Sequence, residues 1–241
     1  MPYLDRDGDV YVLNLGFRDR SDTDNRFHPD WIEEIHALLD EVSAHEGGAN
    51  GRSAPAALVT TATGKIYSNG LDTDWLFANL GEMHGYLDRV HTVFSRLLTF
   101  PMATVAAVNG HAFGAGAMLA SSHDFRVMRA DRGFYCLPEV NLGMPFTVGM
   151  NALVRNQLGM QAAVATMTTG RRFPAADALA AGIVDQTADA DALLATAVER
   201  AAALAPNHGP ALARIKQDLH ADTVAALAVA NTTDNLGFSR A

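Results

Sequence analysis

The chain has 241 residues, of which 49% are hydrophobic and 19% are charged, and its formal net charge is −9. This length buries a substantial core, and the composition is typical of a globular protein rather than a disordered or fibrous one. The acidic balance argues against nucleic-acid binding, and the single cysteine, Cys136, excludes an internal disulfide or a cysteine-based zinc site.

The first hundred residues alternate between strand and helix patterns. The N-terminus lacks the apolar core of a signal peptide, and a turn at Asp7-Gly8-Asp9 predicts a starting β-hairpin. Apolar residues recurring on one face predict helices, and short apolar runs predict buried strands. The predicted strands cover residues 3–6, 10–15, 56–61 and 104–108, the helices 28–42, 75–80 and 83–98, and the loops 18–25 and 47–55.

The second half predicts two further strands and then mostly helices. The strands cover residues 125–128 and 133–137, and the helices cover residues 115–121, 148–158, 161–168, 191–204 and 211–230. Cys136 lies in an apolar strand, which favours a buried, unreactive thiol. Alternating strands and helices indicate an α/β fold, with a boundary near residue 190 and a loosely ordered polar tail from residue 231.

The most apolar window, residues 101–120, contains a glycine-rich turn. Asn109, His111 and three glycines interrupt it, which favours a strand, a turn and a helix over a membrane span. A strand that enters a glycine-rich turn and a helix leaves N–H groups free at a positive helix end, which suits a phosphate or an oxyanion. The spacing matches neither a dinucleotide nor a P-loop motif, and tight packing through small residues is the alternative. We therefore expect a cytoplasmic protein that binds neither membrane nor nucleic acid.

A second strand-to-loop-to-helix unit occupies residues 56–80. Its loop contains Gly64 and Gly70, and Asp72 is placed to cap the following helix. Two such units can each supply one backbone N–H group to the same carbonyl oxygen. The segments Ser68-Asn69-Gly70-Leu71-Asp72 and 106–116 together resemble the crotonase superfamily, the enoyl-CoA hydratase/isomerase family. Residues 134–144 and 176–186 are similar to further segments of that family.

The resemblance implies a fold, an assembly and a substrate class. The fold would be a ββα spiral core over residues 1–190 with a C-terminal helical oligomerisation segment over residues 191–241, in a homotrimer or hexamer. The substrate would be an acyl-CoA thioester, with coenzyme A as part of the substrate, no separate cofactor and no metal. The residues that the resemblance places in contact with the substrate are Ser68, Asn69, Gly70, Asp72, Gly114, Met118 and Lys216.

The resemblance also implies the chemistry. The N–H groups of Leu71 and Ala115 would stabilise an enolate oxygen, and one such donor is typically worth roughly 3–4 kcal/mol of barrier. Family hydratases use two glutamates; Met118 stands at the position of one and Glu139 at the other. A single carboxylate suits Δ3-to-Δ2 enoyl-CoA isomerisation, in which Glu139 moves a proton from C2 to C4.

Several alternatives remain open at this stage. Glu139 could be a surface glutamate, Asp72 a helix cap, His111 a structural histidine, and Arg26 and Lys216 solvated charges rather than ligands of coenzyme A phosphates. A crotonase-type thioester hydrolase or another acyl-CoA enzyme is the alternative reaction. A non-catalytic acyl-CoA-binding subunit is the alternative of a different class.

Overall fold

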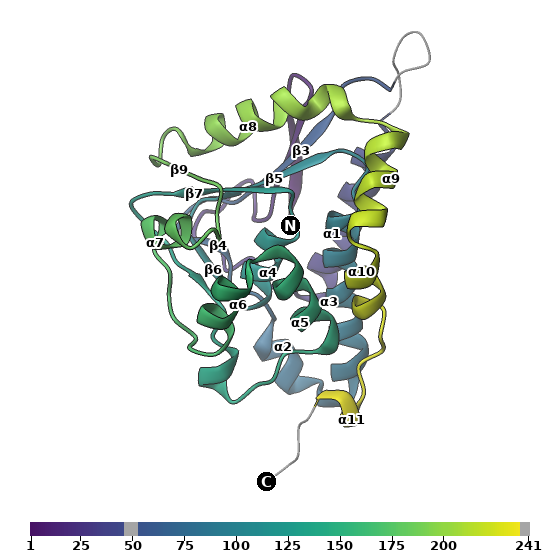
Figure 1. Ribbon diagram of the computed structural model, residues 1–241, viewed down its shortest axis with the longest axis vertical. Coiled ribbons are helices and arrows are strands. Elements are labelled where there is room, and N and C mark those ends of the chain that lie inside the picture. Colours follow the sequence, from purple (N-terminus) through teal and green to yellow (C-terminus); the bar gives the residue numbers. More distant parts are fainter. Residues whose placement is uncertain (46–52, 237–241) are drawn as a thin grey trace.

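A six-stranded sheet with the order β1-β2-β3-β5-β7-β9 forms the centre of the computed structural model, which describes residues 1–45 and 53–236 (Figure 1). The predicted hairpin pairs its two strands antiparallel, and all other neighbours in this sheet are parallel. Its strands are β1 (Tyr3–Asp7), β2 (Val10–Asn14), β3 (Ala57–Thr61), β5 (Ala103–Val108), β7 (Phe125–Arg129) and β9 (Gln186–Ala188). Every residue of β3 and β5 is buried, as expected of parallel strands covered on both faces.

A second, parallel sheet of three short strands lies beside the first. It contains β4 (Ile66–Ser68), β6 (His111–Phe113) and β8 (Tyr135–Cys136). Both β4 and β6 lie where the sequence predicted glycine-containing loops, because three residues are too few to establish an alternating pattern. In each case a long strand continues through a short strand into a helix, so that β3-β4-α2 and β5-β6-α4 are repeats of one strand–strand–helix unit.

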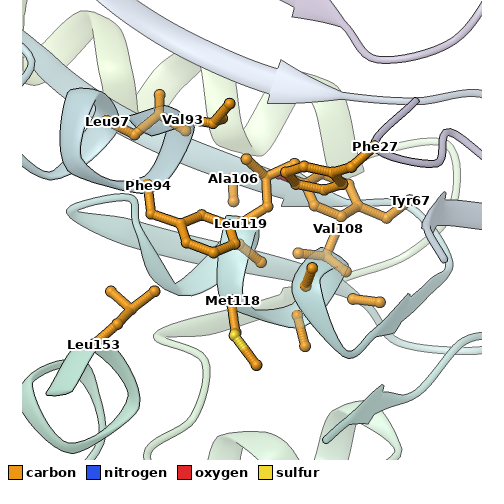
Figure 2. Packing of buried hydrophobic residues seen from close by; sticks show 14 of the residues in the cluster. Phe27, Tyr67, Val93, Phe94, Leu97, Ala106, Val108, Met118, Leu119 and Leu153 are labelled. Atoms are coloured by element: carbon orange, nitrogen blue, oxygen red, sulfur yellow. The ribbon is translucent and has the colours of Figure 1, made fainter. Parts of the chain in front are cut away.

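Helices cover both faces of the large sheet. The main core lies between the sheet and helices α1, α3, α4 and α5, and Figure 2 shows Phe94, Leu119 and Leu153 meeting there. A smaller core lies on the opposite face, beneath α8 (Figure 1). The helices up to α8 are α1 (Pro29–Ser43), α2 (Thr73–Ala78), α3 (Met83–Leu98), α4 (Ala115–Ser121), α5 (Val148–Gln157), α6 (Met160–Met167), α7 (Ala175–Ala180) and α8 (Leu193–Leu204).

The C-terminal segment differs from the sequence prediction in two ways. One helix was predicted over residues 211–230, but α9 (Pro210–Leu219) and α10 (Ala221–Leu227) are separated at His220, whose φ is −107°. The tail was predicted to be loosely ordered, yet residues 231–236 are folded and include α11 (Thr233–Leu236). Asn231 donates to Asp88 from both its backbone N and its Nδ2, at 2.9 and 2.7 Å, which holds this segment on α3.

Two predicted segments lie partly outside the described residues, namely positions 47–52 of the predicted loop and positions 237 and 238 of the tail. Within the part of the chain that is described, no helix combines the length and apolar character needed to span a bilayer.

Candidate active site

The loops that follow β4 and β6 meet at a cavity of about 120 Å3. Three separate segments bring Leu71, Ala115 and Glu139 to its wall, which is otherwise mostly apolar. The full wall consists of Asn69, Leu71, Thr73, Leu76, Met83, Leu87, Phe113, Gly114, Ala115, Pro138, Glu139, Leu142, Met144, Pro145, Thr147, Met150 and Leu236. The predicted donor pair and the predicted base therefore face one space.

Gly70 allows the two loops to touch. Its φ is +80°, and a Cβ at this position would lie 2.6 Å from the carbonyl oxygen of Phe113 and 2.9 Å from the nitrogen of Ala115, so only glycine fits. The carbonyl oxygen of Gly70 accepts a hydrogen bond from the N–H of Phe27 at 2.9 Å. Because a trans peptide is planar, this bond turns the N–H of Leu71 in the opposite direction.

Ala115 supplies the second free amide. It is the first residue of α4, where an N–H has no partner within the helix and adds to the positive end of the helix dipole. The preceding Gly114, at φ +52°, donates from its N to the carbonyl oxygen of Cys136 at 3.0 Å, which ties the turn to β8. Within residues 1–45 and 53–236, neither the Leu71 N–H nor the Ala115 N–H donates to a protein acceptor.

Glu139 stands beside these donors. It follows Pro138 and begins a short 3-10 turn, η2 (Glu139–Leu142), that the sequence analysis did not predict. Its Oε2 is buried and has no hydrogen-bond partner among the described residues, and its Oε1 lies 3.3 Å from the position a Cβ on Gly114 would take. Burial raises the pKa of Glu139 from 4.5 to about 7. A carboxylate so placed is suited to accept and return a proton near neutral pH.

Of the seven predicted substrate contacts, Asn69 and Gly114 lie on the cavity wall, and the other five, Ser68, Gly70, Asp72, Met118 and Lys216, do not. The hydroxyl of Ser68 donates to the carbonyl oxygen of Asn25 at 2.7 Å and accepts from the N–H of Gly70. It therefore stabilises the conformation of the loop after β4. Asp72 caps α2 by accepting from the N–H of Trp75, as its alternative interpretation held. Met118 is fully buried in the main core (Figure 2).

Lys216, predicted to contact the substrate, lies away from the cavity wall. Its side chain is buried, and its Nζ donates to Oδ2 of Asp124 at 2.9 Å and to the carbonyl oxygen of Met102 at 3.2 Å. Lys216 thus holds α9 against the sheet. Arg26 is more accessible, but it pairs with Asp24 and Asp74 at 3.0 and 2.6 Å.

Three other titratable groups, His123, Cys136 and His111, are absent from the cavity wall. The Nδ1 of His123 donates to the carbonyl oxygen of Leu119, its Nε2 accepts from Thr60, and burial lowers its pKa to about 4, so it stays neutral. Cys136 is buried as predicted, and burial raises the pKa of its thiol to about 11. His111 stacks on Phe113, with ring centroids 5.2 Å apart.

Two residues that shape the site, Asn25 and Leu236, were not predicted from the sequence. Asn25, at φ +49°, donates from Nδ2 to the carbonyl oxygens of Ile66 and Tyr67 and so clamps β4. Leu236 closes part of the cavity from the far end of the chain. The tolerance of asparagine for positive φ was the available indication for Asn25, and Thr232-x-x-Asn235, a helix-capping spacing, was the indication that α11 forms.

Comparison with known proteins identifies one family. A family model described as enoyl-CoA hydratase/isomerase matches residues 16–240. "Enoyl-CoA delta isomerase 2, peroxisomal" from Arabidopsis thaliana is 37% identical over 77% of this chain and 76% of its own length, and "Enoyl-CoA delta isomerase 3" from the same plant is 34% identical over 90% and 91%. The structure of human mitochondrial delta3-delta2-enoyl-CoA isomerase superposes with a TM-score of 0.79 at 25% identity, covering 94% of this chain and 85% of that one. The predicted spiral α/β fold is thereby confirmed.

Proposed function

The chain belongs to the enoyl-CoA hydratase/isomerase family, and we propose that it moves the double bond of a 3-enoyl-CoA thioester to the 2-position. The observation that carries this proposal is that the carboxylate of Glu139 and two amides, none of them fully paired within the described part of the chain, share one cavity wall. No other aspartate or glutamate among the described residues lines that cavity.

In the proposed reaction, the main chain stabilises the negative charge. The thioester carbonyl oxygen accepts hydrogen bonds from the N–H groups of Leu71 and Ala115. Removal of a proton from C2 sends the electron pair of the C–H bond toward that oxygen and forms a dienolate. The two amides bind this oxygen more strongly as its charge grows, and losing one such donor typically costs about 100- to 1000-fold in rate.

Glu139 carries the proton. Its carboxylate takes a proton from C2, and the resulting acid gives a proton to C4, so that the C2–C3 double bond forms and the thioester carbonyl is restored. A pKa of about 7 keeps both forms of the carboxyl accessible during one turnover near neutral pH. Coenzyme A enters and leaves as part of the substrate.

The residues around the site disfavour hydration. Adding water to a 2-enoyl thioester requires a group that positions the water, and the family position for a second carboxylate holds the buried, apolar Met118. The names of the three relatives above support isomerisation rather than hydration.

Product analysis with purified protein tests the proposal. With 3-hexenoyl-CoA we expect 2-hexenoyl-CoA and little 3-hydroxyhexanoyl-CoA, and Glu139→Gln should bind substrate but lose turnover. Glu33→Gln, which removes an exposed charge on α1, is the control. Release of free coenzyme A would favour the hydrolase instead, and acyl-CoA binding without any turnover would favour a binding subunit.

We also propose a homotrimer or hexamer that acts in the cytoplasm. Support for an assembly comes from Ile215 and Leu219 on α9, whose exposed fractions are 61% and 66%, because such apolar side chains are candidates for burial at an interface. Light scattering of the purified protein gives the mass of the assembly, and a monomer would refute this part.

A further inference from the structure

The turn at the C-terminal end of the described chain is a built element. The N–H of Thr232 donates to Oδ1 of Asn235 at 2.9 Å, the N–H of Asn235 donates back to Oγ1 of Thr232 at 3.4 Å, and the N–H of Leu236 donates to the carbonyl oxygen of Thr232 at 3.1 Å. This reciprocal arrangement resembles a capping box and satisfies the start of α11. The turn therefore presents Leu236 in a defined direction although its sequence is polar.

A buried tether fixes α11 to α3. Asn231 is 5% exposed, and both of its donors reach the same carboxylate oxygen of Asp88. Asp88 directly follows Leu87, which lines the cavity. The tether thus positions α11 against the part of α3 that forms the cavity wall.

Leu236 belongs to the apolar part of that wall. Its exposed fraction is 2%, and it shares the wall with Leu76, Met83, Leu87 and Met150. In Figure 1, α11 lies at the lower end of the molecule near α2 and α3, whereas β6 and α4 lie nearer its middle. The reactive groups and Leu236 therefore come from different regions of the fold, which is the arrangement expected for the two ends of an acyl pocket.

The size of the cavity limits what it can enclose. An apolar cavity of roughly 150 Å3 holds one benzene molecule, so about 120 Å3 has room for no more than roughly six carbons. We propose that Leu236 ends the acyl pocket, and that the enzyme prefers 3-enoyl thioesters with acyl chains of about six carbons. This inference rests on the isomerase function proposed above, and it adds the acyl length and the residue that sets it.

The test compares kcat/KM for 3-hexenoyl-, 3-octenoyl- and 3-decenoyl-CoA. One methylene in an apolar pocket changes kcat/KM by roughly 10-fold or more, so the wild-type value should fall at least about 10-fold from the hexenoyl to the decenoyl thioester. Leu236→Ala removes three side-chain carbons and should move the optimum to octenoyl- or decenoyl-CoA. Asp88→Ala, which removes the tether from outside the cavity wall, should flatten the same decline.

Leu227→Ala is the matched control. Leu227 is also buried in the C-terminal segment, at 3% exposure, but it packs on Gly149 of α5 and does not line the cavity. The same truncation there should leave the chain-length profile unchanged. Circular dichroism of each variant confirms that the fold is retained.

The outcomes separate this inference from the proposed function. Isomerisation that is equally fast at every chain length would overturn the role of Leu236 and leave the isomerase function standing. An identical profile in the wild type, Leu236→Ala and Asp88→Ala would do the same. Absence of isomerisation at every length would overturn the proposed function itself. Binding of saturated hexanoyl- and decanoyl-CoA to Glu139→Gln, measured by calorimetry, tests the length of the acyl pocket without catalysis. Equal affinities for the two thioesters would refute the proposal that Leu236 ends the pocket.

Discussion

Glu139→Gln should make the protein more stable at alkaline pH while abolishing its activity. Burial raises the pKa of this carboxyl from 4.5 to about 7. Since each pKa unit corresponds to about 1.4 kcal/mol, ionised Glu139 costs the folded state roughly 3 kcal/mol. Glutamine has nearly the same size and never ionises, so it removes this cost.

The sign of the pH dependence follows from proton binding. An unfolded glutamate loses its proton near its ordinary pKa of 4.5, whereas folded Glu139 loses it near 7. Between these values the folded chain binds more protons, so the contribution of Glu139 to stability falls as pH rises and is constant above that window. The gap between Glu139→Gln and wild type should grow from less than roughly 1 kcal/mol near pH 5 to roughly 3 kcal/mol near pH 8.

Urea unfolding at several pH values measures this gap directly. Glu33→Gln, at an exposed position of α1, removes the same charge, and its curve should run parallel to that of the wild type. In the same pH series, kcat/KM of the wild type should rise with pH through about 7, because the carboxylate is the form that removes a proton. A stability gap that is equal at pH 5 and pH 8 would refute the buried, unpaired carboxylate and remove the physical basis for Glu139 as the base.

Three further predictions concern the site and its surroundings. Gly70→Ala should lower kcat about 100-fold or more, because it forces apart the two loops that carry the Leu71 and Ala115 amides. Gly182→Ala, at a similar φ of +69° but with open space around its Cβ, should retain activity. Lys216→Met should lower the free energy of unfolding, measured with urea, by roughly 3 kcal/mol, because it removes the ion-pair partner of Asp124. The KM should not change, and a raised KM would instead support a contact between Lys216 and the substrate. Cys136 should resist iodoacetamide in the folded protein and react only after unfolding, because burial raises the pKa of its thiol to about 11.

Local patterns predicted most of the scaffold. The bounds of α3 and α4 agree with the predicted ranges 83–98 and 115–121, because an apolar face with a period near 3.6 and a glycine-rich start are properties of the sequence itself. The strands β4 and β6 were missed because they are held by pairing with one another rather than by their own composition. A three-residue strand has no pattern to detect.

Burial and pairing between distant residues explain the remaining errors. Lys216 and Asp124 are 92 positions apart, and nothing in a lone lysine on a helix indicates that its charge is taken inside the protein. The order of residues 231–236 depends likewise on Asp88, which lies 143 positions from Asn231. The resemblance named loops that border the cavity, but it did not reveal which of their side chains line it and which, such as Met118, are buried in the core instead.

The site concentrates unsatisfied polar groups, and the surrounding contacts keep them so. Among the described residues, Leu71 and Ala115 find no acceptors for their amides, and one buried oxygen of Glu139 has no donor. Left alone, each group would gain stability by rotating toward a partner. The bonds from Phe27 to the Gly70 carbonyl and from Gly114 to β8 prevent that rotation at the two amides. The reactive geometry is therefore maintained by main-chain hydrogen bonds of the neighbouring loops, and the cost of the unsatisfied groups is the reason that removing the charge of Glu139 should stabilise the fold.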